Sequence, residues 1–182
     1  MNTQNQPVVV AVFGTSKAEP GEAVFETAME LGRLLAENGF TTANGGYGGT
    51  MLAAAKGARM AGGEVIGVTC KTFKRSKANQ YVSREIPSEN LDQRLKTLIE
   101  IGQAYVVLTG GTGTLLELAC VWEQRNKGFS NGDKPIILMG EFWQPLVEMM
   151  SRADSDCGRF VQRVDSPKQA VELLKKHFHR EK

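Results

Sequence analysis

The sequence has few of the residues that build metal sites and disulfides. Its 182 residues include only two histidines and three cysteines. Cys70, Cys120 and Cys157 are widely spaced, without the spacing of metal ligands. An odd number of scattered cysteines is typical of structural thiols in a reducing compartment. We therefore expect a cytoplasmic protein without a metal site.

Long apolar runs are also absent. No stretch approaches the roughly 20 residues that a membrane-spanning helix needs, and residues 1–7 are polar, unlike the apolar centre of a signal peptide. Charges of the two signs nearly balance, with 22 Lys and Arg against 20 Asp and Glu and a net charge of +2. The composition therefore predicts neither a membrane partner nor a nucleic-acid partner.

The chain does contain a regular alternation of apolar segments. Hydrophobic residues make up 41% of the sequence, which is enough for the core of one α/β domain spanning residues 1–182. Short apolar runs predict strands, and apolar residues at helical spacing predict helices. We expect strands at 8–13, 40–43, 64–69, 81–86, 104–108 and 135–139, and helices at 23–38, 50–61, 90–101, 114–126, 143–152 and 168–178. This order predicts an α/β, Rossmann-like, doubly wound and mainly parallel sheet with helices on both faces.

Two glycine-rich loops, 44–49 and 109–114, each follow an expected strand and precede an expected helix. Neither has the spacing of a dinucleotide fingerprint, because Met51 and Leu116 occupy the place of the last glycine, and no Gly-Lys-Ser/Thr ending makes a Walker loop. A helix N-terminus offers unpaired N–H groups and the positive end of a dipole, which suits a phosphate. The alternative is that these glycines only make tight turns.

Glu117 fits two interpretations. Thr114 and Glu117 have the spacing of a capping box, in which the threonine side chain caps the helix and the glutamate reaches back to the threonine amide. A carboxylate beside a phosphate-binding loop is equally suited to chemistry, and the spacing alone leaves both roles open.

Arg94 borders the apolar face of its expected helix, which carries Leu91, Leu95, Leu98 and Ile101. An arginine there must either find an anion or extend its charged group to solvent. Both outcomes remain open.

A basic cluster, Lys71, Lys74, Arg75 and Lys77, follows the third expected strand. Its simple interpretation is a solvated loop. The alternative is a flap over an anionic ligand.

The two glycine motifs together resemble those of the LONELY GUY (LOG) family, whose members were long labelled lysine decarboxylases. The motifs are residues 44–51 and 110–117. The resemblance implies a Rossmann-like fold, usually as a homodimer. It also implies hydrolysis of the N-glycosidic bond of a nucleoside 5′-monophosphate, such as AMP or a cytokinin nucleotide, to a free base and ribose 5-phosphate, without a cofactor.

The resemblance also assigns roles to residues. Arg94 and Glu117 match the family's catalytic pair. The phosphate cradle corresponds to Gly111, Thr112, Gly113 and Thr114. The nucleotide pocket corresponds to Gly14, Thr15, Ser16, Gly45 and Gly46.

Two other functions compete with hydrolysis. Leu116 and Cys120 stand where many family members carry acidic residues, and Thr109 stands where a proline is usual. These departures favour a non-catalytic carrier of a nucleotide or of a molybdenum-cofactor-like pterin on the same fold. A genuine amino-acid decarboxylase would need a lysine anchoring pyridoxal phosphate, and no lysine here lies in a recognisable context for it.

Overall fold

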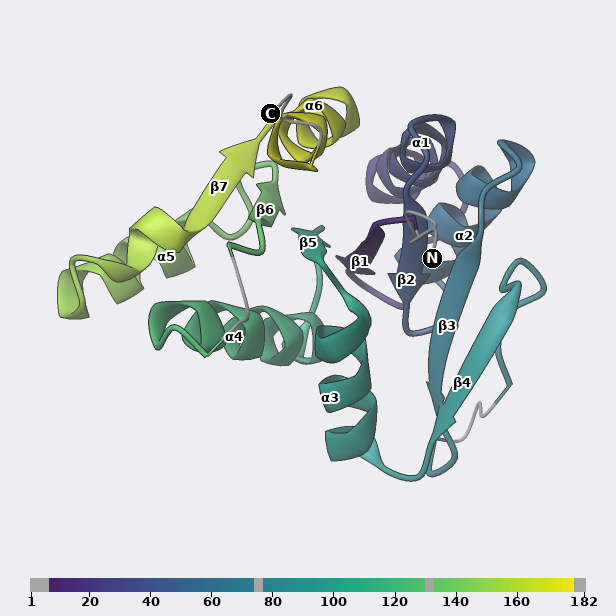
Figure 1. Cartoon of the computed structure of the whole chain (residues 1–182), viewed down its shortest axis with the longest axis horizontal. Helices are drawn as coiled ribbons and strands as arrows, with labels where there is room; N and C mark the ends of the chain where they lie inside the picture. The colour runs from purple at the N-terminus through teal and green to yellow at the C-terminus, as the bar shows by residue number, and fades with distance from the viewer. Residues whose placement is uncertain (1–6, 74–76, 130–132, 179–182) are drawn as a thin grey trace, which may run out of the picture.

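A parallel sheet of seven strands forms the centre of the structure, a computed structural model that describes residues 7–73, 77–129 and 133–178. The strand order is β4-β3-β2-β1-β5-β6-β7, and every neighbouring pair is parallel (Figure 1). The strands are β1 (Val9–Phe13), β2 (Thr41–Asn44), β3 (Val65–Cys70), β4 (Arg84–Ser88), β5 (Ala104–Val107), β6 (Ile136–Met139) and β7 (Val161–Val164). The order changes direction between β1 and β5, which makes the carboxyl ends of these two strands the expected place for a ligand.

Helices cover both faces of this sheet (Figure 1). One face carries α1 (Ala23–Glu37), α2 (Thr50–Met60) and α6 (Pro167–Phe178), and the other carries α3 (Leu91–Ile101), α4 (Thr112–Asn126) and α5 (Gln144–Ala153). Each face has its own buried apolar cluster, because successive strand residues point to opposite sides. Val10 and Val12 of β1 belong to the first cluster, and Ala11 and Phe13 belong to the second.

The predicted fold class is confirmed, and most element boundaries agree with the structure within two residues. The sequence analysis missed a 3₁₀ turn, η1 (Cys157–Phe160), and the edge strand β7. In β7 the central residues are exposed, so no apolar run marks the strand. The predicted strand at 81–86 was placed too early: β4 begins at Arg84, since Asn79 holds the preceding residues in a turn by accepting a hydrogen bond from the Tyr81 N–H.

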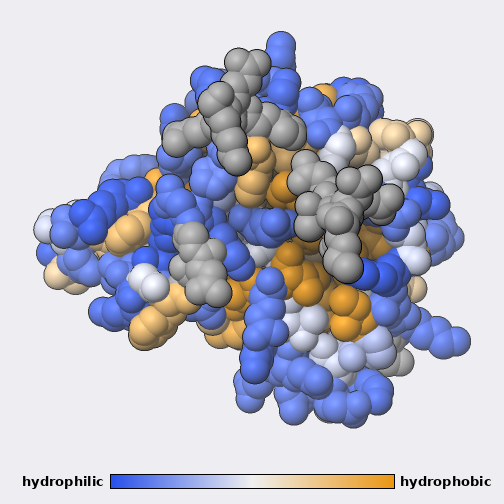
Figure 2. Space-filling view, viewed as in Figure 1, coloured by the Kyte–Doolittle hydropathy of each residue, from blue (hydrophilic) through white to orange (hydrophobic). Residues whose placement is uncertain are grey.

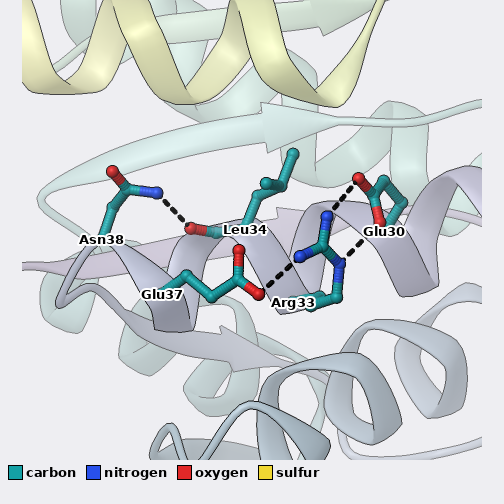
Figure 3. A network of polar contacts seen from close by, with 5 residues as sticks. All are labelled: Glu30, Arg33, Leu34, Glu37 and Asn38. Atoms are coloured by element: carbon teal, nitrogen blue, oxygen red, sulfur yellow. Dashed lines mark hydrogen bonds and ion pairs between the residues drawn. The ribbon is translucent and has the colours of Figure 1, made fainter.

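Polar residues cover most of the face seen in Figure 2, and hydrophobic residues gather near its centre. The surface of α1 carries an ion-pair network in which Arg33 pairs with Glu30 and Glu37 (Figure 3). At the end of the same helix, the Asn38 side chain donates to the Leu34 carbonyl, 2.8 Å away (Figure 3). All these groups are exposed or half-buried, and such surface pairs contribute little to stability.

No helix in the described part of the chain combines the length and the apolarity that crossing a membrane requires.

The contact between α1 and α2 depends on a glycine. Gly32 of α1 is buried against the backbone of α2, and a Cβ at this position would clash with the Ala54 carbonyl group. Because the obstacle is backbone, it cannot rotate away, and the two helices would have to separate.

We expect Gly32→Ala to lower the free energy of unfolding by about 1–3 kcal/mol, although alanine is the better helix former, because overpacking outweighs propensity here. Urea denaturation measures the change. Glu37→Ala on the exposed side of the same helix is the control and should change stability little. A Gly32→Ala protein as stable as the wild type would contradict this account of the helix contact.

Candidate active site

A cleft of about 1010 Å³ opens at the carboxyl ends of β1 and β5. Its lining comes from the segments that follow β1, β2, β3 and β5 and from the starts of α3 and α4. Almost all the residues expected at the site line this cleft: Gly14, Thr15, Ser16, Gly45, Arg94, Gly111, Thr112, Gly113, Thr114 and Glu117. Gly46 does not line it; its carbonyl instead accepts hydrogen bonds from the backbone and side chain of Asn79.

The N-terminus of α4 is open toward the cleft. Its N-cap is Gly111, which has no side chain to cap the helix, and Gly111, Thr112 and Gly113 are exposed. The first N–H groups of a helix have no partner within the helix and lie at the positive end of its dipole. This end of α4 therefore has the free donors that an anion such as a phosphate requires.

The N-terminus of α2 differs, although a similar glycine loop precedes it. The Thr15 carbonyl oxygen accepts hydrogen bonds from the Thr50 N–H at 2.9 Å and from the Thr50 hydroxyl at 3.0 Å. The chain following β1 thus caps α2 from outside. Of the two helix N-termini that follow a glycine loop, the one of α4 is therefore the open one.

Arg94 and Glu117 form a buried ion pair at the inner end of the cleft. Their residues are 7% and 9% exposed, and the Arg94 Nη1 lies 3.4 Å from the Glu117 Oε1. The Arg94 Nε also donates to the Val68 carbonyl at 2.9 Å. Arg94 therefore does not extend to solvent, and the structure resolves that alternative in favour of an anion partner.

The capping-box interpretation of Glu117 is wrong. Helix α4 begins at Thr112, two residues earlier than expected, so Thr114 lies within its first turn rather than at its N-cap. The Glu117 carboxylate pairs with Arg94, a residue of another helix. Its position is therefore set by tertiary contact across the cleft.

Burial changes the acidity of Glu117. Removal from water raises the pKa of its carboxyl to about 7, and the nearby positive charge of Arg94 lowers the pKa only in part. A carboxyl group with a pKa near neutrality can exchange a proton at physiological pH, which is the property required of a general acid or base.

Two aromatic residues that the sequence analysis did not select complete the surroundings of Arg94. The guanidinium carbon lies 5.8 Å from the ring centre of Tyr47 and 5.7 Å from that of Phe73, within the range of cation–π attraction. Both rings line the cleft. Tyr47 lies in the glycine loop 44–49, and Phe73 lies within the basic cluster. The presence of an aromatic residue in each of these segments was the signal that could have identified Tyr47 and Phe73 from the sequence.

Gly45 provides the space for Arg94. A Cβ at Gly45 would clash with the Arg94 Nη2 and would lie 2.8 Å from the Met51 Sδ. The conformation of the arginine therefore depends on the absence of a side chain at this position.

Lys17 and Lys71 differ in their relation to the cleft. Lys17 lines the cleft and was not selected from the sequence. Within the basic cluster, Lys71 forms an ion pair with Glu89, whereas Lys74 and Arg75 lie outside the described residues.

Over the described ranges, no three His, Cys, Asp or Glu residues gather in a way that could hold a metal ion.

Comparisons with known proteins show the family. Residues 7–171 match the model of the SLOG cluster4 family. The cytokinin riboside 5′-monophosphate phosphoribohydrolase of Mycobacterium tuberculosis is 33% identical over 132 residues, which cover 71% of this chain and 69% of that enzyme.

Solved structures with the same fold include carriers. The molybdenum cofactor carrier protein of Chlamydomonas reinhardtii is 25% identical, with a TM-score of 0.76 over 93% of this chain and 97% of that protein. The molybdenum cofactor binding protein of Rippkaea orientalis has a TM-score of 0.78 over 96% of this chain and 99% of that chain, but at 23% identity it shows the fold alone.

The raised pKa of Glu117 has a consequence for stability. In the unfolded chain a glutamate titrates near 4.5, whereas in the folded protein Glu117 keeps its proton up to about pH 7. The folded state thus binds the extra proton between these values, and stability falls as pH rises through this window. Above about pH 7 this loss is complete, at about 3 kcal/mol.

The free energy of unfolding of the wild type should fall over this window, whereas that of Glu117→Gln should not, because glutamine does not titrate. We therefore expect the difference between the two, variant minus wild type, to increase by about 3 kcal/mol from pH 4.5 to pH 7. Chemical denaturation of both proteins at several pH values measures the difference. A constant difference across this range would show that the carboxyl titrates normally.

We expect Gly45→Ala to displace the Arg94 guanidinium and to weaken its pairing with Glu117, while the fold is retained, since the atom in the way is the end of a side chain. Loss of the cation should raise the pKa of Glu117 further, which ¹³C NMR of the carboxyl group measures. Gly48→Ala is the control, because a Cβ there makes only an ordinary contact, 3.5 Å from the Ser16 carbonyl oxygen. Equal pKa values in the two variants would contradict the role of Gly45.

Proposed function

This chain belongs to the SLOG cluster4 family, and we propose that it hydrolyses the N-glycosidic bond of a nucleoside 5′-monophosphate. The observation that carries this proposal is the buried Arg94–Glu117 pair in a cleft whose rim includes the uncapped N-terminus of α4. The name of the Mycobacterium tuberculosis relative supports it. The proposed enzyme is a homodimer, as the resemblance to the LOG family implies, and it is cytoplasmic, as the scattered cysteines predict.

The phosphate would bind at the start of α4. The amides of Thr112, Gly113 and Thr114 are the donors there. Lys17 lines the same cleft, and no ion pair of its side chain occurs among the described residues, so its charge is available to a phosphate. Binding energy from this remote group would hold the sugar in place for reaction.

Glu117 would act at the sugar. Cleavage of a ribosyl bond builds positive charge on the sugar ring, which a nearby carboxylate stabilises. Glu117 would also remove a proton from the water that attacks the anomeric carbon. The base leaves with the electron pair of the broken bond and takes a proton from solvent, and Glu117 returns its own proton to solvent.

Arg94 would position Glu117 rather than hold the phosphate. Its Nε is already bound to the Val68 carbonyl and its Nη1 to Glu117. Its charge also keeps the pKa of Glu117 from rising above neutrality. The pair thus maintains a carboxylate fraction sufficient for a base at physiological pH.

A second candidate function is transport of a phosphorylated cofactor without chemistry. The similarity to the Chlamydomonas reinhardtii carrier favours it, as does the volume of the cleft, at the upper end of the range for small-molecule sites. A carrier would use α4 and Lys17 in the same way, with Glu117 serving only to bind.

Incubation with a panel of nucleoside monophosphates, followed by chromatography, tests the first proposal. We expect the wild type to release free base, and Glu117→Gln to lose at least about 100-fold in rate, because the general base is gone. Nucleotide binding, measured by calorimetry, should survive in the variant.

Glu123→Gln is the matched control, since Glu123 lies on the exposed side of the same helix and contacts only the surface residues Lys127 and Asn126 through its carboxylate among the described residues. It should turn over like the wild type. Full activity of Glu117→Gln would exclude Glu117 as the base. No base release from any nucleotide, together with ligand-induced thermal stabilisation, would favour the carrier.

A further inference from the structure

We propose that Phe73 and Tyr47 form a subsite for the aromatic base of the nucleotide, so that the ligand lies with its phosphate at α4 and its base against Phe73. This inference rests on the proposed function in that it takes a nucleotide as the ligand. It adds where each part of that nucleotide binds, and which residues select an aromatic base.

Phe73 has the exposure of a ligand-binding residue. The residue is 37% exposed although it lines the cleft, and a large aromatic ring left uncovered in a concave site is available to a ligand. The backbone beneath it is fixed, because the Phe73 N–H donates to the Cys70 carbonyl and the Lys71 N–H donates to the Ser88 carbonyl at the end of β4. The ring is therefore presented from an anchored turn.

Tyr47 packs beside Phe73 in the cleft. The two ring centres are 5.8 Å apart, with an angle of 41° between the ring planes. The Tyr47 hydroxyl accepts a hydrogen bond from the Cys70 N–H at 2.7 Å, and the Asn79 side chain donates to the Tyr47 carbonyl at 2.9 Å. Because these contacts exist before any ligand binds, a stacked base would not have to pay for ordering the rings.

The groups follow one another along the cleft in the order found in a nucleoside monophosphate. Glu117 lies six residues after Gly111 on α4, about 9 Å along the helix axis. Arg94 lies between Glu117 and the two rings. Its Nη1 is 3.4 Å from the Glu117 Oε1, and its guanidinium carbon is 5.7 Å from the ring centre of Phe73 and 5.8 Å from that of Tyr47. Helix N-terminus, carboxylate and aromatic rings thus correspond to phosphate, sugar and base.

The chemistry of the subsite defines the ligand class. Aromatic rings beside a guanidinium bind flat, electron-rich rings by stacking, and stacking tolerates different bases because every base has a π-face. The apolar side chains of Leu91, Leu95 and Leu116 also line the cleft and suit the flat faces of such a ring. We therefore expect selection for an aromatic base rather than for one pattern of hydrogen-bonding groups.

Calorimetry on the Glu117→Gln protein tests the subsite without turnover. The probes are AMP, which has a base, and ribose 5-phosphate, which has none. We expect Phe73→Ala to raise the Kd of AMP about 5- to 100-fold and to leave the Kd of ribose 5-phosphate within about twofold. Phe73→Tyr should bind AMP like the parent protein, because the ring remains.

The control is Phe129→Ala, since Phe129 is 76% exposed after α4 and does not line the cleft. An unchanged Kd of AMP in Phe73→Ala, an equal loss for both probes, or no AMP binding to the parent protein would overturn the subsite. The proposed hydrolysis fails separately, if wild-type protein binds AMP without releasing adenine. In that case the Kd values of AMP and ribose 5-phosphate would still support the subsite.

Discussion

The burial of one guanidinium group organises the site. A charged group removed from water must be compensated by close partners, and Arg94 obtains them from four separate parts of the chain. The Val68 carbonyl lies within β3, Glu117 lies on α4, which follows β5, and the two rings follow β2 and β3. Gly45 leaves the space that the group occupies. The partners are tied to three strands, β2, β3 and β5, so these strands must be assembled before the arginine is satisfied.

The fold could be predicted because its determinants are local. Apolar runs such as 104–108 and helical periods such as 23–38 specify a buried strand and an amphipathic helix from neighbouring residues alone. Where such a pattern was missing, the prediction failed: β7 is a short edge strand whose exposed Gln162 and Arg163 interrupt any apolar run. At β4, a turn stabilised by Asn79 displaced the strand by three residues.

The site could be predicted only in part, since its geometry depends on contacts between distant segments. The residues Glu117 and Arg94 were selected, but whether the carboxylate capped its own helix was decided by the position of α3. The two glycine loops are alike in sequence, and the carbonyl of Thr15 makes them different. The same scaffold occurs in a relative named as an enzyme and in a carrier, so the fold does not decide between the two functions.

The segment after β1 also determines how the cleft can admit a ligand. The Thr15 N–H bonds to the Thr109 carbonyl beside one glycine loop, and the Thr15 carbonyl holds the first residue of the helix after the other. Each of the two segments can therefore move away only by breaking its own hydrogen bonds to Thr15. These hydrogen bonds thus set the distance between the two walls, and access to the interior must come from rotation of an exposed side chain at the rim such as Leu116.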